Sequence, residues 1–578
     1  MPKAQRQNFL QGAMILTAAM VVVKVIGAVY KIPLTNILGG TGMAYFMTAY
    51  SIFNIINLLS TAGFPVAVSK MVSENAARGQ YRNVEKIRRL SVAFFLITGG
   101  VGSLTLVLGA KTFVGWVGNP NAYLAVLAIA PAVFFCCVMA VFRGYAQGMS
   151  NMLPTAVSQI VEAICKLIFG IFFAYLFIHL GLKDYEKTGA VFGQVVENAD
   201  AAKLAVMPYG AAGAMLGVSV STLAGAVYLL VTAKKSKLAQ SRGPSGEKVD
   251  SASRLLKSLL LIALPVCAGS LMAQLTSVID LVSIMKRLET AVALGGDTVR
   301  SLYSGLLPPG IASEDLPVYL YGSYSGLTIS IFNLVPAITS AFGVSALPSI
   351  ASNWALGRRA AAGENIRSVV KLAALLAIPA GLGIAALSHP ILSLLYSNRI
   401  QEVAIAAPLL RIMGISAVFL AVNAPLTSIH QAIGKVHVPV LLMSVGAVLK
   451  LITNYILVAI PSVNIGGAPW GTLVCYGFIF IGSLISLKKH TGLDLKIKST
   501  LIIPLICGIL CGLAAHTSFG ILSSRVDSRF GVLLSIGIGG AIYLVFILLL
   551  KVITREEALL LPNGKKIAKI LEKLSFLG

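Results

Sequence analysis

Long runs of apolar residues recur along this chain from one end to the other, separated by short polar segments. Most runs hold about twenty residues with few charges, which is the length an α-helix needs to cross the hydrocarbon core of a bilayer. The pattern predicts an all-α polytopic membrane protein of about fourteen transmembrane helices. The predicted spans lie at residues 9–33, 43–66, 90–112, 122–144, 154–180, 208–232, 255–285, 320–345, 367–388, 403–429, 436–460, 467–487, 498–520 and 530–552.

The composition agrees with this pattern. Hydrophobic residues make up 57% of the 578 positions and charged residues only 12%. The mean hydropathy is +0.86. A soluble domain carries about twice that fraction of charged residues. Water therefore cannot be the solvent for most of the chain, and a soluble multidomain protein is excluded.

The chain is strongly basic, with a formal net charge of +25. Roughly two-thirds of the 46 lysines and arginines fall in loops that the predicted topology places on one side of the membrane. Since basic loops collect on the cytoplasmic side, we predict a plasma-membrane protein with both termini in the cytoplasm. The charge also favours contact with anionic membrane lipids. We expect no nucleic-acid partner.

The sequence contains an internal repeat. The four residues Ser51–Asn54 recur as Ser330–Asn333, 279 positions later. In a second stretch Lys166 matches Lys450 at the nearly equal offset of 284. These offsets carry the second predicted span onto the eighth and the fifth onto the eleventh, a shift of six helices. An even shift predicts two parallel six-helix lobes related by a pseudo-two-fold axis along the membrane normal.

The repeat and the polar segments divide the chain into five parts. An N-terminal lobe at 1–235 is followed by a cytoplasmic linker at 236–254, which is rich in polar residues and glycine. A C-terminal lobe occupies 255–487. Two further transmembrane helices, the thirteenth and fourteenth, occupy 488–552. The tail at 553–578 has apolar residues at helical spacing with lysines between them, which predicts an amphipathic helix on the cytoplasmic leaflet.

Charged residues inside the predicted spans are the clearest functional signal. Each costs roughly 2.5–3.5 kcal/mol at the centre of a bilayer by insertion scales. Such residues therefore face a watery cavity or one another. Four are cations and two are anions, an excess that favours an anionic substrate. They are Lys24, Glu162, Lys166, Asp280, Arg411 and Lys450.

Three of the cations are candidates for binding that anion. Lys24 shares a helical face with Lys31, and no acidic residue lies within two turns, so it either faces a cavity or pairs with a distant helix. Lys450 has Gly446 in the position of the Glu162 carboxylate of the first repeat, which leaves it less compensated. Arg411 provides a guanidinium suited to bidentate phosphate recognition.

The other polar residues allow two interpretations each. Glu162 and Lys166 are four residues apart, in the order that favours a helical ion pair, so they form a structural pair or a proton or cation switch. Asp280 reaches the water at a span end or couples transport to an ion. The repeated Asn54 and Asn333 lie on polar faces that hydrogen-bond a neighbouring helix or line water, where they would contact the substrate.

Motifs of catalysis and metal binding are absent from the sequence. It has no Walker A loop, no H-E-x-x-H and no G-x-S-x-G elbow. The seven cysteines all fall in predicted spans, without zinc spacing. We therefore expect a protein that is not an enzyme and uses neither a cofactor nor a metal.

One block of sequence resembles a known family. The segments Phe142–Gly148 (FRGYAQG) and Asn151–Glu162 (NMLPTAVSQIVE), with Gly63–Lys70, resemble the stage V sporulation protein B (SpoVB) group of polysaccharide-biosynthesis exporters. That group belongs to the MOP superfamily, alongside MATE exporters and MurJ-type lipid II flippases. The resemblance implies a MATE/MurJ-like fold and a flippase that moves an undecaprenyl-linked peptidoglycan or polysaccharide precursor to the outer leaflet by alternating access.

Two other functions stay open at this point. A MATE-like, cation-coupled multidrug exporter needs an acidic cavity, for which only Glu162 and Asp280 are available. A non-transporting scaffold for wall or spore-cortex synthesis would use the long predicted outer segments at about 181–207 and 286–319 to hold cell-wall synthesis proteins.

Overall fold

The computed structural model describes residues 9–61, 63–235, 250–261, 263, 279–309, 311–525, 527–552, 554 and 572. Helices dominate these residues, and two compact units divide them. Unit 1 holds the described residues up to Gly296 together with Leu307–Gly326. Unit 2 holds Asp297–Leu306 and the described residues from Leu327 onward. The amphipathic tail, most of the linker and most of the span predicted at 255–285 lie outside the described residues.

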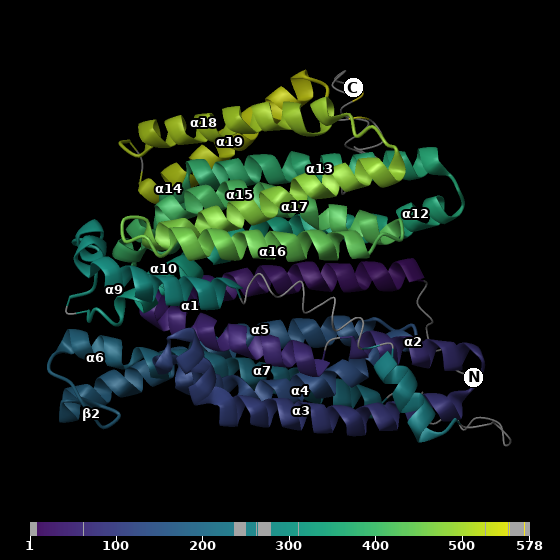
Figure 1. The fold of residues 1–578 in the computed structure, drawn as a ribbon, viewed down its shortest axis with the longest axis horizontal. Helices are drawn as coiled ribbons and strands as arrows, with labels where there is room; N and C mark the ends of the chain where they lie inside the picture. Colours follow the sequence, from purple (N-terminus) through teal and green to yellow (C-terminus); the bar gives the residue numbers. More distant parts are fainter. Residues whose placement is uncertain are drawn as a thin grey trace. The chain divides into compact units, whose positions relative to one another are not determined.

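Unit 1 is built from long helices joined by short turns (Figure 1). Its elements are α1 (Phe9–Thr61), α2 (Phe64–Ala77), α3 (Tyr81–Val117), η1 (Pro120–Ala122), α4 (Tyr123–Gly148), α5 (Leu153–Thr188), β1 (Ala190–Val191), β2 (Gln194–Val195), α6 (Ala199–Ala205), α7 (Met207–Lys235), the π-helical η3 (Asp280–Ile284), most of α9 (Met285–Leu302), and α10 (Leu316–Ser323).

Unit 2 begins inside the π-helical η4 (Tyr324–Thr328) and also consists of helices. Its further elements are α11 (Ile329–Phe332), α12 (Leu334–Ala355), α13 (Arg359–Ala386), α14 (Ser388–Leu395), α15 (Ile400–Ala432), α16 (His437–Leu457), η5 (Asn464–Gly466), α17 (Gly467–Thr491), the π-helical η6 (Lys498–Ile502), α18 (Ile503–Leu522) and α19 (Ser528–Leu549).

The two units share an order of packing. In unit 1, α3 packs on α4, α4 on α7, and α7 on α5. In unit 2, α13 packs on α15, α15 on α17, and α17 on α16. Helices α5 and α16 carry the repeat partners Lys166 and Lys450. Each is therefore the last helix in the packing order of its unit. The internal repeat thus corresponds to a repeated arrangement of helices.

Helix α1 folds back on itself at Gly39. This glycine has φ 62° and ψ −169°, a backbone conformation that glycine adopts without strain. Tyr30 and Phe46 are sixteen residues apart and would be about 24 Å apart along a straight helix. Their ring centroids are 6.3 Å apart. The chain therefore reverses between them, as expected for the two spans predicted at 9–33 and 43–66.

Eleven helical stretches among the described residues are long and apolar enough to cross a membrane. One of them, Ala18–Ala77, contains the hairpin of α1 and counts once although two spans are predicted there. The predicted span at 320–345 is divided among α10, η4, α11 and α12. The structure confirms a helical, multi-pass membrane protein. The total of fourteen spans and the symmetry axis stay predictions.

The segment predicted as a long outer loop at 181–207 is structured. Helix α5 continues to Thr188, and a two-strand antiparallel hairpin pairs Ala190 with Val195. Val191 and Val206 are buried in a small apolar cluster with α6 residues. A second such segment contains Tyr303, whose hydroxyl donates to Asn464 Oδ1 at 2.6 Å within unit 2. Burial raises the pKa of Tyr303 to about 12, so this donor stays protonated at neutral pH.

Close packing of α5 on α7 depends on two glycines. A Cβ atom at Gly217 would overlap the backbone of Gly170. We expect Gly217→Ala to force the two helices apart and to destabilise the protein by about 1–3 kcal/mol, the usual cost of overpacking. The measurement is thermal unfolding of the purified protein. Gly100→Ala on α3 is the matched control, because a Cβ there meets nothing within 4 Å. Equal stability of the two variants would contradict the packing described.

Candidate functional site

Lys166 lies over two tyrosine rings in the interior of unit 1. Its Nζ atom is 4.6 Å from the ring centroid of Tyr50 and 5.3 Å from that of Tyr30. The two tyrosines come from the two arms of the α1 hairpin, and Lys166 comes from α5. One turn further along α5, Gly170 leaves room for the Tyr30 ring, since a Cβ there would lie 2.7 Å from it.

A second lysine lies near the first. Lys31 on α1 directly follows Tyr30 and interacts electrostatically with Lys166, and both side chains are partly buried. Among the described residues, neither forms an ion pair with a carboxylate. We call Tyr30, Lys31, Tyr50 and Lys166 the lysine–tyrosine site.

The tyrosine rings offset only part of the cost of these charges. An ammonium group inside the bilayer costs roughly 2.5–3.5 kcal/mol. A cation–π contact returns about 0.5–1 kcal/mol at an exposed site and about 2 when desolvated. Two neighbouring lysines therefore need water or an anion to complete their stabilisation. The site has the chemistry of an anion-binding site.

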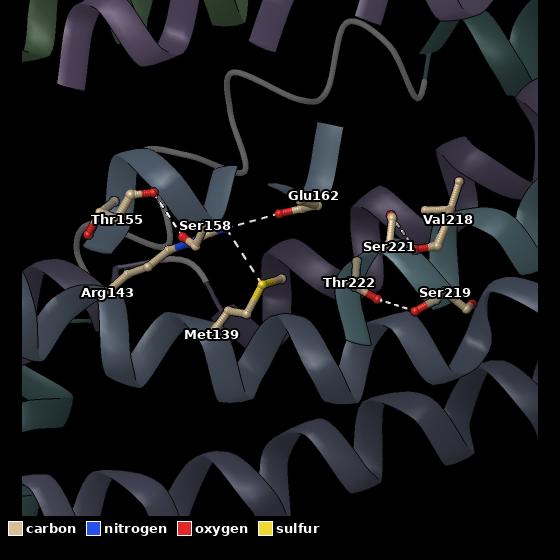
Figure 2. A network of polar contacts seen from close by, with 9 residues as sticks. All are labelled: Met139, Arg143, Thr155, Ser158, Glu162, Val218, Ser219, Ser221 and Thr222. Atoms are coloured by element: carbon tan, nitrogen blue, oxygen red, sulfur yellow. Dashed lines mark hydrogen bonds and ion pairs between the residues drawn. The ribbon is translucent and has the colours of Figure 1, made fainter. Parts of the chain in front are cut away.

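Glu162 pairs with an arginine from the neighbouring helix (Figure 2). Its Oε2 accepts a hydrogen bond from Nη2 of Arg143 on α4 at 3.0 Å. The pairing of Glu162 with Lys166 that their four-residue spacing suggested is therefore wrong. Glu162 is neutralised by Arg143, and Lys166 instead contacts the two tyrosine rings.

Arg143 is held by more than this carboxylate. Its Nε donates to Ser158 Oγ at 3.0 Å, and that hydroxyl donates to the backbone oxygen of Thr155 at 2.8 Å. Nη2 also lies 3.5 Å from the sulfur of Met139. Figure 2 shows these groups converging between α4 and α5. The arrangement fixes the start of α5, and with it the residues that follow on the same helix.

In unit 2 the repeat lysine is also beside a tyrosine. Lys450 on α16 is 2% exposed, and its Nζ lies 5.9 Å from the ring centroid of Tyr476 on α17. At Gly446 the helix packs closely on Ile479, because a Cβ there would lie 2.9 Å from that side chain. Each unit therefore places one repeat-related lysine near an aromatic ring, partly buried in unit 1 and buried in unit 2.

The remaining predicted site residues are dispersed within their own units. Lys24 is exposed on the first arm of α1, and Arg411 is exposed on α15. Asn54 is partly buried on the second arm of α1. Asn333 is exposed and donates to the backbone oxygen of Ile329 at 3.0 Å. Asp280 begins the π-helical η3 and interacts electrostatically with Tyr321 of α10 in unit 1.

Four of the residues named above have no distinct signal in the sequence. Lys31 is there only a neighbour of Lys24 on a helical face, and Arg143 is only part of the FRGYAQG block. Tyr30 and Tyr50 carried no signal, because aromatic residues are common in apolar helices. Among the residues that the structure describes, no group of three or more His, Cys, Asp and Glu side chains is placed to hold a metal ion.

Comparison with known proteins places this geometry in a family. The family described as "Polysaccharide biosynthesis protein" matches residues 9–200, and the family "MatE" matches residues 324–456. Lipid II flippase MurJ of Bacillus subtilis (strain 168) is 25% identical over 93% of this chain and 94% of its own. Stage V sporulation protein B of the same organism is 22% identical over 96% and 98%.

A solved structure has the same fold. "Lipid II flippase MurJ, inward closed conformation" aligns with a TM-score of 0.60 at 15% identity, over 92% of this chain and 98% of that chain. Together the two family matches, the relatives and the fold support a flippase family of the MOP superfamily for this chain. The predicted MATE/MurJ-like class of fold is thereby confirmed. The lysine–tyrosine site lies within the first matched region of the chain, and Arg411 and Lys450 lie within the second.

Proposed function

We propose that this protein is a flippase that moves an undecaprenyl-linked cell-wall precursor from the inner to the outer leaflet. A diphosphate headgroup with sugars cannot cross hydrocarbon unaided, because its charges and hydrogen-bonding groups lose their water. The polyprenyl tail can remain in lipid. The protein then needs an interior site that takes up the anionic headgroup and alternates its access between the two sides. The relatives named as lipid II flippase and stage V sporulation protein B support this function.

The lysine–tyrosine site is the observation that carries the proposal. Lys31 and Lys166 interact electrostatically as charges of the same sign inside a helical membrane protein, and no described carboxylate forms an ion pair with either one. A diphosphate would supply the missing negative charge, with an ammonium group hydrogen-bonding each phosphate. The hydroxyl of Tyr30 is buried without a hydrogen-bond partner among the described residues, so it is available to the same ligand.

Other residues extend the proposal to both lobes. We propose that Lys24, Arg411, Lys450 and Asn333 contact the headgroup at other stages of the cycle, and that Glu162 or Asp280 couples the cycle to an ion or to the membrane potential. The two units would correspond to two lobes, with the described residues up to Gly296 and Leu307–Gly326 in the first lobe and not in the second as predicted from the boundary at 255. Both termini would lie in the cytoplasm, with the additional helices α18 and α19 beside the second lobe.

Export of organic cations is the alternative that the "MatE" match brings. Such a substrate needs an unneutralised carboxylate. Glu162 is bound to Arg143 at 3.0 Å, and the lysine–tyrosine site would repel a cation. The structure of unit 1 therefore favours an anionic substrate over an organic cation.

Growth of a bacterial strain depleted of its lipid II flippase separates these functions. We expect expression of this chain to restore growth, and we expect its deletion in the parent organism to leave susceptibility to cationic drugs unchanged. Failure to restore growth, together with drug hypersensitivity of the deletion strain, would contradict the flippase function and support the exporter.

The same assay tests the other proposed cations. Replacing Lys24 and Lys450 together with glutamine should abolish restoration of growth, because the headgroup would lose its electrostatic contacts outside the lysine–tyrosine site. The protein should still insert, as judged by its amount in isolated membranes. The control is Lys183→Gln with Lys187→Gln, which removes two exposed charges at the end of α5. Full growth with the Lys24 and Lys450 double variant would remove both residues from the proposed path.

A further inference from the structure

The contact between Lys166 and Tyr50 is one end of a longer polar face. Gln159 precedes Lys166 by seven residues on α5, and Asn57 follows Tyr50 by seven residues on α1. Seven residues make almost two full helical turns, about 10 Å along the axis. Each amide therefore lies on the same face of its helix as the residue that forms the contact.

The two amides lie on the same side of that contact because α5 and the second arm of α1 are antiparallel. A Cβ at Gly144, near the end of α4, would come 2.7 Å from the backbone oxygen of Pro65, just after α1 ends at Thr61. Helix α5 begins at Leu153, shortly after α4 ends at Gly148. The start of α5 is therefore at the end of α1, and the two helices pack together.

These amides have unused hydrogen-bonding groups in the interior. The Oδ1 atom of Asn57 and the Oε1 atom of Gln159 are buried, and neither accepts a hydrogen bond from the described residues. The hydroxyl of Tyr30, a residue only 1% exposed, also has no hydrogen-bond partner among the described residues, and its ring lies against Lys166. Buried polar groups in folded proteins are nearly always paired, so these three unpaired atoms call for a ligand or water. Asn54 lies between Tyr50 and Asn57 on the same arm and is partly buried.

The chemistry of this cluster differs from that of the lysine–tyrosine site. Side-chain amides are neutral and offer both donors and acceptors, which is what hydroxyl and acetamido groups of a sugar need. Because the amides are neutral, they provide no positive charge that would attract a phosphate. Glu162, at the level of Asn54, is neutralised by Arg143 and so does not repel a phosphate bound nearby. The order along α5 is thus a neutral hydrogen-bonding region followed by a cationic one.

We propose that Asn54, Asn57 and Gln159 form a sugar-binding subsite next to the lysine–tyrosine site. This inference rests on the proposed function and adds to it the residues that contact the first sugar of the headgroup and so determine specificity for a glycosylated lipid diphosphate. The lysines bind the diphosphate, and the amides bind the first sugar, on the side of the lysines that leads to the start of α5. A lipid diphosphate without a sugar leaves the amides unpaired and binds less tightly.

The test compares two probes on the purified protein in detergent or nanodiscs. One probe is undecaprenyl diphosphate, and the other is the same lipid with one N-acetylhexosamine on the diphosphate. We expect the intact protein to bind the glycosylated lipid at least tenfold more tightly. Asn57→Leu with Gln159→Met, which keeps the side-chain volumes, should remove that preference and change the affinity for the bare lipid by less than twofold. Each single replacement should remove about half of the logarithm of the ratio between the two dissociation constants.

Other outcomes separate this subsite from the anion site. Equal affinity of the intact protein for the two lipids would overturn the sugar subsite, and so would an equal loss of both affinities in the amide variants. If the amide double variant fails to fold, the single variants and the preference of the intact protein decide the question. Lys31→Gln with Lys166→Gln should weaken both lipids alike. If this variant binds both lipids as tightly as the intact protein does, the lysine–tyrosine site does not bind the diphosphate, whereas the sugar preference of the intact protein is still tested separately.

Discussion

Replacing Lys31 and Lys166 together with glutamine should lower the affinity of the protein for undecaprenyl diphosphate by about a hundredfold or more. A hydrogen bond to a charged group contributes about 1.5–3 kcal/mol, and two such bonds are lost. Glutamine keeps most of the side-chain volume, so the tyrosine rings retain a neighbour. The measurement is the dissociation constant from titration of the purified protein with the lipid. Salt should weaken binding to the intact protein and affect the variant much less.

The control removes the same net charge from the far end of α5. Lys183 and Lys187 are exposed near the end of α5, and their replacement by glutamine should leave the affinity unchanged within twofold. Lys166→Arg should retain most of the affinity, because arginine keeps the charge. A double lysine variant that binds the lipid as well as the intact protein would show that this site does not hold the headgroup.

Breaking the ion pair between Arg143 and Glu162 should have the largest effect on stability. Removing one partner of a fully buried pair costs about 3–5 kcal/mol, because a charge is left uncompensated. These side chains are 19% and 29% exposed, so we expect about 2 kcal/mol for Arg143→Met and for Glu162→Gln. Loss of Arg143 also leaves the hydroxyl of Ser158 without its donor. The measurement is thermal unfolding of each purified variant.

The double variant completes this test. When both charges are absent, no uncompensated charge remains, so the combined cost should be well below the sum of the single costs. Costs that simply add would show that the two side chains do not interact in the folded protein. Activity of the Glu162→Gln variant over a range of pH and sodium concentration would then show whether this carboxylate also couples transport to an ion.

The sequence predicts the class of fold because the bilayer imposes a strong pattern. Apolar runs of about twenty residues are typical of membrane-spanning helices, and the repeat of Lys166 at Lys450 anticipates the matching places of α5 and α16. The reversal of α1 at Gly39 also follows from two adjacent runs with glycines between them. The interruption of the span at 320–345 by a π-helical turn has no comparable signal, since local helix geometry there depends on packing within the fold.

Of the candidate site, only its positive charge could be predicted from the sequence. The charge of Lys166 within a predicted span marks it as a candidate. The four-residue spacing from Glu162 suggests an ion pair between the two as one interpretation. The actual pair of Glu162 with Arg143 depends on how α4 and α5 pack. Lys31 was placed near a span end, whereas the fold brings it beside Lys166. The two tyrosines that hold Lys166 come from separate arms of a hairpin. Such contacts join residues far apart in the chain, and one sequence has no pattern that reports them.

Translocation measured leaflet by leaflet tests the central claim most directly. Labelled lipid II is placed in one leaflet of vesicles that contain the purified protein, and its appearance in the other leaflet is followed over time. We expect the intact protein and the Lys183 and Lys187 control variant to accelerate translocation at least tenfold over protein-free vesicles, and the Lys31 and Lys166 variant not to do so. Equal rates for the intact protein and the Lys31 and Lys166 variant would contradict a headgroup site at these lysines.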